Sequence, residues 1–262
     1  MAMRRSWLIL AASGLALAGA FAQDAAAPKT LLAFCGSKGF RHTACSYGKP
    51  ILTKMGEDSG QFRVLCSEDP KVFNPDFLKG IACVVLNNTT GSFMDADQRQ
   101  ALLEYVRNGG ALVGIHAATD AMYDWPEYNE LLGGWFDGHP WSEKVTVKVE
   151  VPDHPACQPV DKPWVINDEI YQQRNWSRDK ICVLMTLDPN GTDFTKPGIK
   201  REDKDFGIAW CRKVGKGRVF YTALGHREDV WDNPMYQAHL LGGILWAMGV
   251  QDFPCEPHPK PQ

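Results

Sequence analysis

Short apolar runs alternate with helix-like segments along the first half of the chain. The runs are rich in Leu, Val, Ile and Ala, and they stand at 30–35, 61–66, 81–86 and 111–115. Such short runs are typical of fully buried strands. Helices are predicted at 43–57 and 95–108, the second beginning beside Asp95 and closing at two glycines. The alternation predicts an α/β fold with a doubly wound, mainly parallel sheet and helices on both faces.

The second half of the chain has a different pattern. Residues 144–151 alternate polar and apolar positions, which predicts a strand with one solvated face. Further strands are predicted at 164–171 and 181–187, and a hairpin at 206–211 and 218–224. An amphipathic helix is expected at 234–248, followed by a proline-rich, poorly ordered tail at 253–262.

The composition indicates one globular domain and limits the classes of partner that it could bind. The chain has 262 residues, of which 44% are hydrophobic, and a formal net charge of -3. Without a basic excess, nothing indicates nucleic-acid binding. Residues 23–252 are enough for a single α/β domain. The sequence leaves the oligomeric state open, including a homo-oligomer.

Residues 1–22 have the features of a secretory signal peptide. Arg4 and Arg5 precede an apolar run, and Ala20 to Ala22 form a cleavage motif before Gln23. The paired arginines also suit twin-arginine export. We therefore expect an exported protein, periplasmic or extracellular, that is not inserted in a membrane once the signal is cleaved.

Eight cysteines follow the predicted signal peptide. Their even number permits disulfides in an exported protein, although the sequence specifies no pairing. The alternative, buried free thiols, suits the four that lie in apolar runs. The chain has no C-x-x-C spacing, which argues against a structural zinc or dithiol redox motif. These four cysteines are Cys35, Cys83, Cys182 and Cys211.

The stretch Leu112 to Asp120 forms the most distinctive feature of the sequence. An apolar strand ends in Gly-Ile-His-Ala-Ala, which predicts a turn from a strand into a helix with His116 at its tip. Such elbows in α/β enzymes usually present a serine or cysteine nucleophile. The carboxyl edge of an open α/β sheet is also where ligands bind. We therefore expect His116 at the mouth of a crevice.

Five short motifs carry a resemblance to a known family. They are Gly-Phe-Arg-His at 39–42, Gly-Ile-His at 114–116, Gly-Gly-x-Phe-x-Gly-His-Pro at 133–140, Asp-Glu-Ile-Tyr at 168–171 and Gly-His at 225–226. In this order they resemble the ThuA-like, or trehalose-utilisation, family. The resemblance implies a flavodoxin-like fold similar to class I glutamine amidotransferases, and a link to the catabolism of oxidised disaccharides. Amidotransferases place a cysteine at the elbow, so His116 argues against glutaminase activity.

Polar residues at the predicted strand ends form the candidate site. If the sheet is doubly wound, they converge on one edge. A divalent metal such as zinc, held by His116, His139 and His226, is one interpretation. The alternative is a metal-free acid–base site in which His116 or His226 moves protons while Glu169 orients one of them. The converging set is His42, His116, His139, Glu169 and His226.

A small carbohydrate is the expected ligand, because aromatic side chains stack on sugar rings. The predicted substrate-binding residues are His42, Asp120, Tyr171 and Trp231. Several other aromatic residues fall near these positions in the sequence. We assign no role to His154, His239 and His258, which are expected on the surface, in the last helix and in the tail.

Three functional hypotheses follow. The first is an exported enzyme that acts on a glycoside or keto-glycoside by hydrolysis or elimination, with His116, Glu169 and His226 as catalytic residues. The second is a non-catalytic sugar-binding module on an amidotransferase-like scaffold. The third, a structural subunit of a sugar-processing complex, has no positive feature in the sequence.

Overall fold

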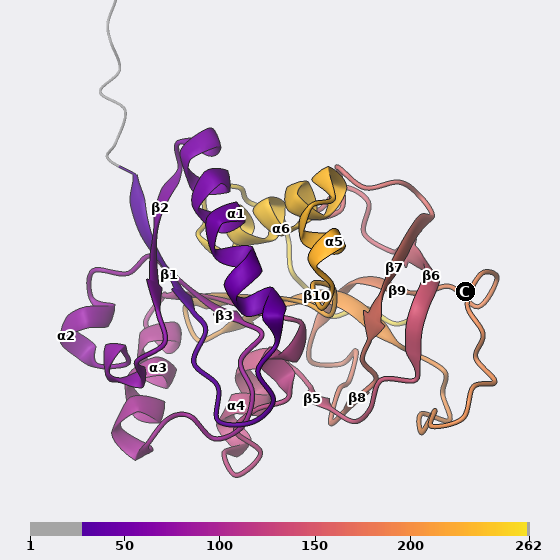
Figure 1. Cartoon of the computed structure of the whole chain (residues 1–262), viewed down its shortest axis with the longest axis horizontal. Helices are drawn as coiled ribbons and strands as arrows, with labels where there is room; N and C mark the ends of the chain where they lie inside the picture. The colour runs from indigo at the N-terminus through magenta and orange to yellow at the C-terminus, as the bar shows by residue number, and fades with distance from the viewer. Residues whose placement is uncertain (1–27, 261–262) are drawn as a thin grey trace, which may run out of the picture.

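The computed structural model describes residues 28–260 (Figure 1). The predicted signal peptide lies outside these residues. Within the described range, no helix combines the length and the apolar character needed to span a bilayer.

One sheet of nine strands forms the centre of the fold. Its parallel half contains, in spatial order, β2 (Phe62–Ser67), β1 (Lys29–Phe34), β3 (Cys83–Asn87), β4 (Ala111–Ile115) and β11 (Gly217–Thr222). Its antiparallel half continues with β10 (Gly207–Val214), β9 (Cys182–Leu187), β6 (Trp141–Val149) and β7 (Trp164–Ile170). A separate small sheet pairs β5 (Trp135–Phe136) with β8 (Gln173–Arg174).

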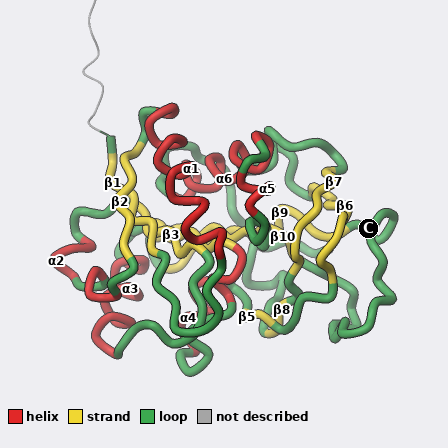
Figure 2. Tube along the Cα trace, in the orientation of Figure 1, coloured by secondary structure: helices red, strands yellow, loops and turns green. Residues whose placement is uncertain are grey.

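Helices cover both faces of the sheet, as predicted (Figures 1 and 2). One face carries α1 (Thr43–Ser59), α5 (Glu228–Trp231) and α6 (Pro234–Ala247). The other carries α2 (Pro75–Leu78), α3 (Ala96–Arg107) and α4 (Pro126–Leu132). Two 3-10 turns, η1 (Pro70–Val72) and η2 (His116–Thr119), complete the elements.

Buried side chains on both faces explain the continuous apolar strands. In β1, Leu31 and Ala33 belong to the core beneath α1 and α6, whereas Leu32 and Phe34 belong to the core beneath α2, α3 and α4. Successive residues of a strand point to opposite faces, so a strand covered on both sides has no polar positions. The buried-strand prediction is confirmed for β1, β3 and β4. It is wrong for β2, which is the edge strand of the sheet and is buried at Phe62 only.

Helix α3 shows how local sequence sets an element boundary. The Asp95 carboxylate accepts the Gln98 backbone N–H at 2.9 Å, and the Gln98 side-chain oxygen accepts the Asp95 N–H at 3.0 Å. This capping box satisfies two backbone donors that a helix start otherwise leaves free. The helix start predicted beside Asp95 is therefore confirmed.

One expectation about the C-terminal region is wrong. Helix α6 is buried over most of its surface and is not amphipathic, because it packs between the sheet and neighbouring loops. The proline-rich segment after it forms no helix or strand through residue 260, although Cys255 is buried and the ring N–H of His258 donates to the Val183 carbonyl at 2.8 Å. His154, expected at the surface, is completely buried.

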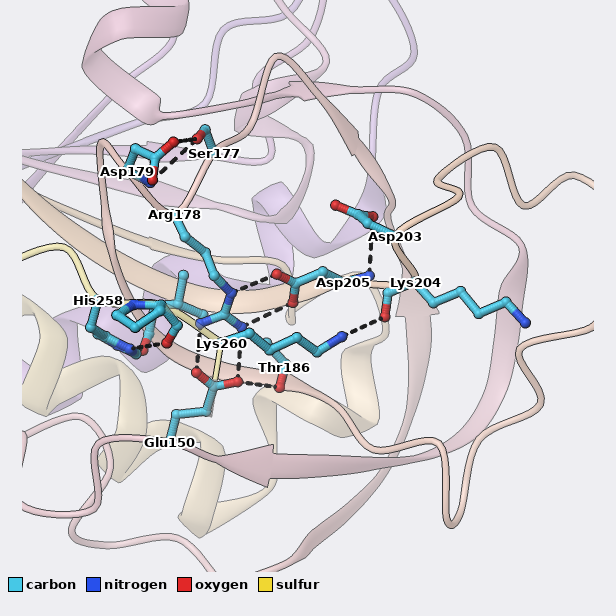
Figure 3. A network of polar contacts seen from close by, with 12 residues as sticks. Glu150, Ser177, Arg178, Asp179, Thr186, Asp203, Lys204, Asp205, His258 and Lys260 are labelled. Atoms are coloured by element: carbon cyan, nitrogen blue, oxygen red, sulfur yellow. Dashed lines mark hydrogen bonds and ion pairs between the residues drawn. The ribbon is translucent and has the colours of Figure 1, made fainter. Parts of the chain in front are cut away.

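A buried ion pair ties together segments of the antiparallel half (Figure 3). The Arg178 guanidinium donates to both oxygens of Glu150, at 2.8 and 2.9 Å, and to Oδ1 of Asp205 at 2.9 Å. Thr186 donates its hydroxyl hydrogen to Glu150 at 2.8 Å. The side chains of Arg178, Glu150 and Asp205 are 9%, 1% and 8% exposed. Their charges are therefore compensated mainly by one another.

Two buried histidines predict that the fold loses stability in mild acid. Burial lowers the pKa of both His239 and His154 to about 4, from an ordinary 6.5. Between these pH values the unfolded chain binds more protons than the folded protein, so stability falls as pH falls below 6.5. We expect each histidine to contribute a loss of about 2 kcal/mol by pH 5. Urea unfolding measured between pH 7.5 and 5 checks this.

A His154→Gln variant is the matched test of this pH dependence. It should flatten the fall in stability between pH 6.5 and 5, because one of the buried histidines with a lowered pKa is removed. The partly exposed His258 supplies the control, since His258→Gln should leave the slope close to that of the parent protein. If the parent, His154→Gln and His258→Gln proteins all lose stability equally as the pH falls, His154 does not contribute to this pH dependence.

Candidate metal and acid–base site

His116 stands at the tip of the turn that follows β4. Its φ angle is 46°, in the left-handed region that residues other than glycine rarely adopt. Its Nδ1 lies 2.8 Å from the Ala223 carbonyl oxygen, which can only accept, so Nδ1 carries the proton. The other ring nitrogen, Nε2, faces Glu169 and His226.

His226 follows β11 and meets His116. Its Nδ1 lies 3.1 Å from His116 Nε2. The preceding Gly225 has a φ of 105°, and a Cβ there would lie 2.4 Å from the Tyr236 hydroxyl, so the turn requires glycine. Burial and then the neighbouring His116 lower the pKa of His226.

His42 closes the group from the loop after β1. Its ring meets those of His116 and His226 edge-on, with centroids 5.4 and 5.2 Å away. The residue is 5% exposed, and its Nδ1 is buried without a hydrogen-bond partner in the described structure. Burial, followed by the two neighbouring histidines, lowers the pKa of His42 to about 3. The ring is therefore neutral at physiological pH, the form that binds metals.

Glu169, on β7, supplies the negative charge. Its Oε1 lies 3.5 Å from His116 Nε2 and 3.5 Å from His226 Nδ1. Burial by itself raises the pKa of Glu169, but the hydrogen bond with His116 and the nearby His226 lower it overall. The carboxylate is therefore ionised and lies beside His116 Nε2. A proton on that nitrogen, or a metal cation between the two atoms, would stabilise the contact.

The four residues fit a divalent metal of the zinc type. One ligand atom from each of His42, His116, Glu169 and His226 lies within 4.8 Å of the others. Zinc bound tetrahedrally at 2.0–2.1 Å holds its ligand atoms roughly 3.3 Å apart. The contacts of 3.1 and 3.5 Å between these side chains are close to that spacing.

Asp168 positions the loop that carries His226, and the sequence analysis assigned it no role. Its buried carboxylate accepts the backbone N–H of Gly225 at 2.7 Å and of Arg227 at 3.1 Å. Burial raises the pKa of Asp168, and the nearby His116 and these donors oppose the shift. The sequence did offer a signal for Asp168. It lies between apolar residues, and a carboxylate that is buried there needs a hydrogen-bond or charge partner.

The contact between Asp168 and Gly225 also shows how the sheet closes the site. Strand β7 stands four places from β11, roughly 19 Å in a flat sheet with normal strand spacing. A hydrogen bond between them requires the antiparallel end of the sheet to curl over the strand ends. Figure 1 shows β6 and β7 steeply inclined to β10.

The other residues predicted for the site lie at different places around the cluster. His139 is half-exposed at the rim, with Nδ1 3.7 Å from the outer oxygen of Glu169, so His42 takes the place predicted for it in the cluster. Asp120 is partly buried and accepts the Tyr123 hydroxyl at 2.5 Å. Tyr171 is buried, with its ring centroid 4.1 Å from that of His116.

Trp231, which was predicted to bind substrate, packs inside the core. It is completely buried beneath α1, and its indole N–H donates to the Gly225 carbonyl at 3.0 Å. Its position supports the His226 turn from within the core. Other aromatic residues near the predicted site in the sequence are likewise core residues: Trp125, Tyr128, Trp135, Trp141 and Trp176 are buried.

Open hollows flank the cluster between α1 and α5. One, of about 760 Å³, is lined by His42, and a neighbouring one is lined by His226. They share the polar residues Thr43, Tyr47, Glu228 and Asp232. A ligand in this groove would meet hydroxyl and carboxylate groups more than aromatic faces.

Comparison with known proteins decides the family. A family model described as ThuA, trehalose utilisation, matches residues 30–247. The chain belongs to the ThuA family. This ThuA-family protein resembles the solved structure of a ThuA-like protein from Bacteroides uniformis ATCC 8492, with a TM-score of 0.70 and 23% identity over 87% of this chain and 95% of that chain. A ThuA-like protein from Parabacteroides merdae ATCC 43184 gives a TM-score of 0.65 and 22% identity over 88% and 97% of the two chains.

A search of curated proteins finds no match to the ThuA-family sequence. The structural likenesses establish the glutamine amidotransferase-like fold, which confirms the predicted fold class. The site of this ThuA-family protein must therefore be interpreted from its own residues.

Because Asp168 holds the turn that carries His226, replacing it should weaken metal binding at the cluster. In Asp168→Asn, one carboxylate oxygen is replaced by an amide donor that faces backbone N–H groups. We expect the turn at 225–227 to shift, with a roughly 10–100-fold loss of zinc affinity and about 1–3 kcal/mol less stability. Isothermal titration and urea unfolding check this. Asp229→Asn, which changes an exposed carboxylate on the same loop, is the control; equal zinc affinities in both variants would rule out the positioning role.

Proposed function

We propose that this ThuA-family protein is an exported carbohydrate-processing enzyme that acts on a glycoside or keto-glycoside at a divalent-metal site. The observation that carries the proposal is the contact between the ionised Glu169 and Nε2 of His116, with His42 and His226 around them. Three imidazoles form a catalytic zinc site when the fourth position stays open, which leaves the Glu169 carboxylate available as a base.

The proposed chemistry begins with a proton beside a carbonyl group. A keto sugar is acidic at the carbon next to its carbonyl, and Glu169 is an ionised carboxylate that is 15% exposed. Glu169 removes this proton, the electron pair forms a double bond, and the bond to the glycosidic oxygen breaks. A divalent metal bound by His42, His116 and His226 would supply Lewis-acid stabilisation of the negative charge.

His139 fits a proton-exchange role at the rim. Its Nδ1 lies 3.7 Å from the outer oxygen of Glu169, and its side chain is 53% exposed. A half-exposed imidazole beside the carboxylate can return a proton from it to water or to the leaving group.

Metal analysis combined with a turnover assay tests the proposal. The full chain, purified without chelator, should hold about one zinc-type ion per molecule and convert a keto-disaccharide, and a chelator should abolish turnover. Glu169→Gln should retain the metal but lose turnover if Glu169 is the base; loss of both would make it the fourth ligand.

The competing function is a non-catalytic sugar-binding module. It predicts no bound metal, no turnover of any keto-glycoside, and unchanged sugar affinity in a His116→Ala variant. That combination would overturn the enzymatic proposal. Turnover that survives complete metal removal would instead support a metal-free acid–base site.

A further inference from the structure

Three buried cysteines meet on the side of the sheet where the C-terminal segment returns. Cys182 lies on β9, Cys211 on β10 and Cys255 in the segment after α6. Their sulfur atoms all lie within 4.8 Å of one another, and none of the three residues is more than 4% exposed. Cys182 and Cys211 are register partners on neighbouring strands.

The sulfur atoms of Cys211 and Cys255 lie 2.9 Å apart. A zinc ion holds thiolate sulfurs at 2.3 Å, which spaces them roughly 3.8 Å from each other, and a structural zinc site needs four ligands. Among the described residues, this group contains only three metal-binding side chains. The short contact and the missing fourth ligand both favour a covalent bond over a metal.

The segment that carries Cys255 has little else to hold it. Residues 252–260 form no helix or strand and, within the described chain, make no backbone–backbone hydrogen bond. Side-chain contacts attach the segment instead, such as the Trp246 indole N–H donating to the Phe253 carbonyl at 3.0 Å. Segments attached this way open at low free-energy cost. A covalent bond at Cys255 would prevent that opening.

We propose that Cys211 and Cys255 form a disulfide in the oxidised protein and thereby fasten the C-terminal segment to the sheet. The two thiols lose two protons and two electrons to a disulfide oxidant, such as glutathione disulfide or a disulfide oxidoreductase, which leaves as two thiols. The exchange passes through a mixed disulfide with one of the two cysteines. Cys182 remains a thiol. Nothing in this step depends on the proposed enzymatic activity.

Peptide mapping on the unmodified chain tests the pairing directly. Trypsin places the three cysteines in different peptides, 181–200, 205–212 and 228–262, because Lys-Pro bonds resist cleavage. After equilibration with a glutathione redox buffer, acid quench and digestion without reductant, we expect 205–212 linked to 228–262. Peptide 181–200 should carry an alkylated thiol. Three alkylated peptides, or a link from 181–200 to either of the others, would overturn the proposal.

Thermal unfolding tests whether the bond fastens the segment. The unmodified protein refolded with a reductant should melt at least about 5 °C below the oxidised protein. Cys255→Ala should melt at one temperature under both conditions. Cys66→Ala removes an exposed thiol and should keep the parent's dependence on reductant. An equal melting temperature for oxidised and reduced parent protein would overturn the fastening role, and peptide mapping of Cys255→Ala should show no linked peptide.

Discussion

A His116→Asn protein is expected to lose its bound metal and its turnover together. Asparagine tolerates the left-handed backbone that His116 adopts, at a φ of 46°, so the turn should survive the change. What disappears is the nitrogen that faces Glu169 and His226. We expect a loss of more than about 100-fold in zinc affinity and a fall of about 10²–10⁴-fold in turnover of a keto-glycoside. Equilibrium dialysis with zinc and steady-state kinetics measure the two effects.

Two comparisons make the His116 result interpretable. Circular dichroism should show an unchanged fold in His116→Asn, and His258→Gln, which alters a histidine far from the cluster in the C-terminal segment, should behave like the parent protein. Zinc affinity preserved in His116→Asn would show that the metal, if any, binds elsewhere. Turnover lost with affinity preserved would make His116 a proton-transfer residue.

Replacing Arg178 by Met should give the largest loss of stability outside the site. The change leaves the carboxylates of Glu150 and Asp205, which are 1% and 8% exposed, without their shared cation. Breaking a buried ion pair by removing one partner typically costs about 3–5 kcal/mol, because the remaining charges are neither solvated nor compensated. Urea unfolding at pH 7, followed by circular dichroism, measures the difference.

The cost should depend on the unpaired charges and not on lost packing. Removing all three charges in a triple Arg178→Met, Glu150→Met and Asp205→Leu protein should recover much of the lost stability. Lys54→Met, which breaks an exposed pair with Asp58, should change stability little. An unchanged unfolding midpoint in Arg178→Met would show that the buried pair contributes nothing.

The fold was predictable where local sequence decides it. Apolar runs buried on both faces identified β1, β3 and β4, and the capping box at Asp95 identified the start of α3. The burial of α6 was not predictable, because a helix's surroundings depend on what packs over it. The curl of the antiparallel half was missed for the same reason. It arises from strand pairing and twist across the whole sheet, which no segment encodes by itself.

The sequence was sufficient to predict that histidines and a carboxylate form the candidate site, but it predicted only some of the residues that meet there. Residues after β1, β4 and β11 meet because parallel strands end at one edge, so His42, His116 and His226 follow from topology. Their functional roles stay predictions. Topology did not predict the positions of the His139 and Trp231 side chains. A histidine two residues before a strand can lie at the rim, and a tryptophan beside the site can face the core.

Strand β11 lies between β4 and β10 in the sheet. In the sequence, however, α4 and all the strands from β5 to β10 separate β4 from β11. The contact between His116 and His226 therefore spans 110 positions. A nascent chain that has left the ribosome only as far as β9 carries His42, His116 and Glu169, but not their last neighbour. Closing so long a loop is entropically costly and slow. The crevice should thus be among the last parts of the molecule to form, and ligand binding would report that the whole chain has folded.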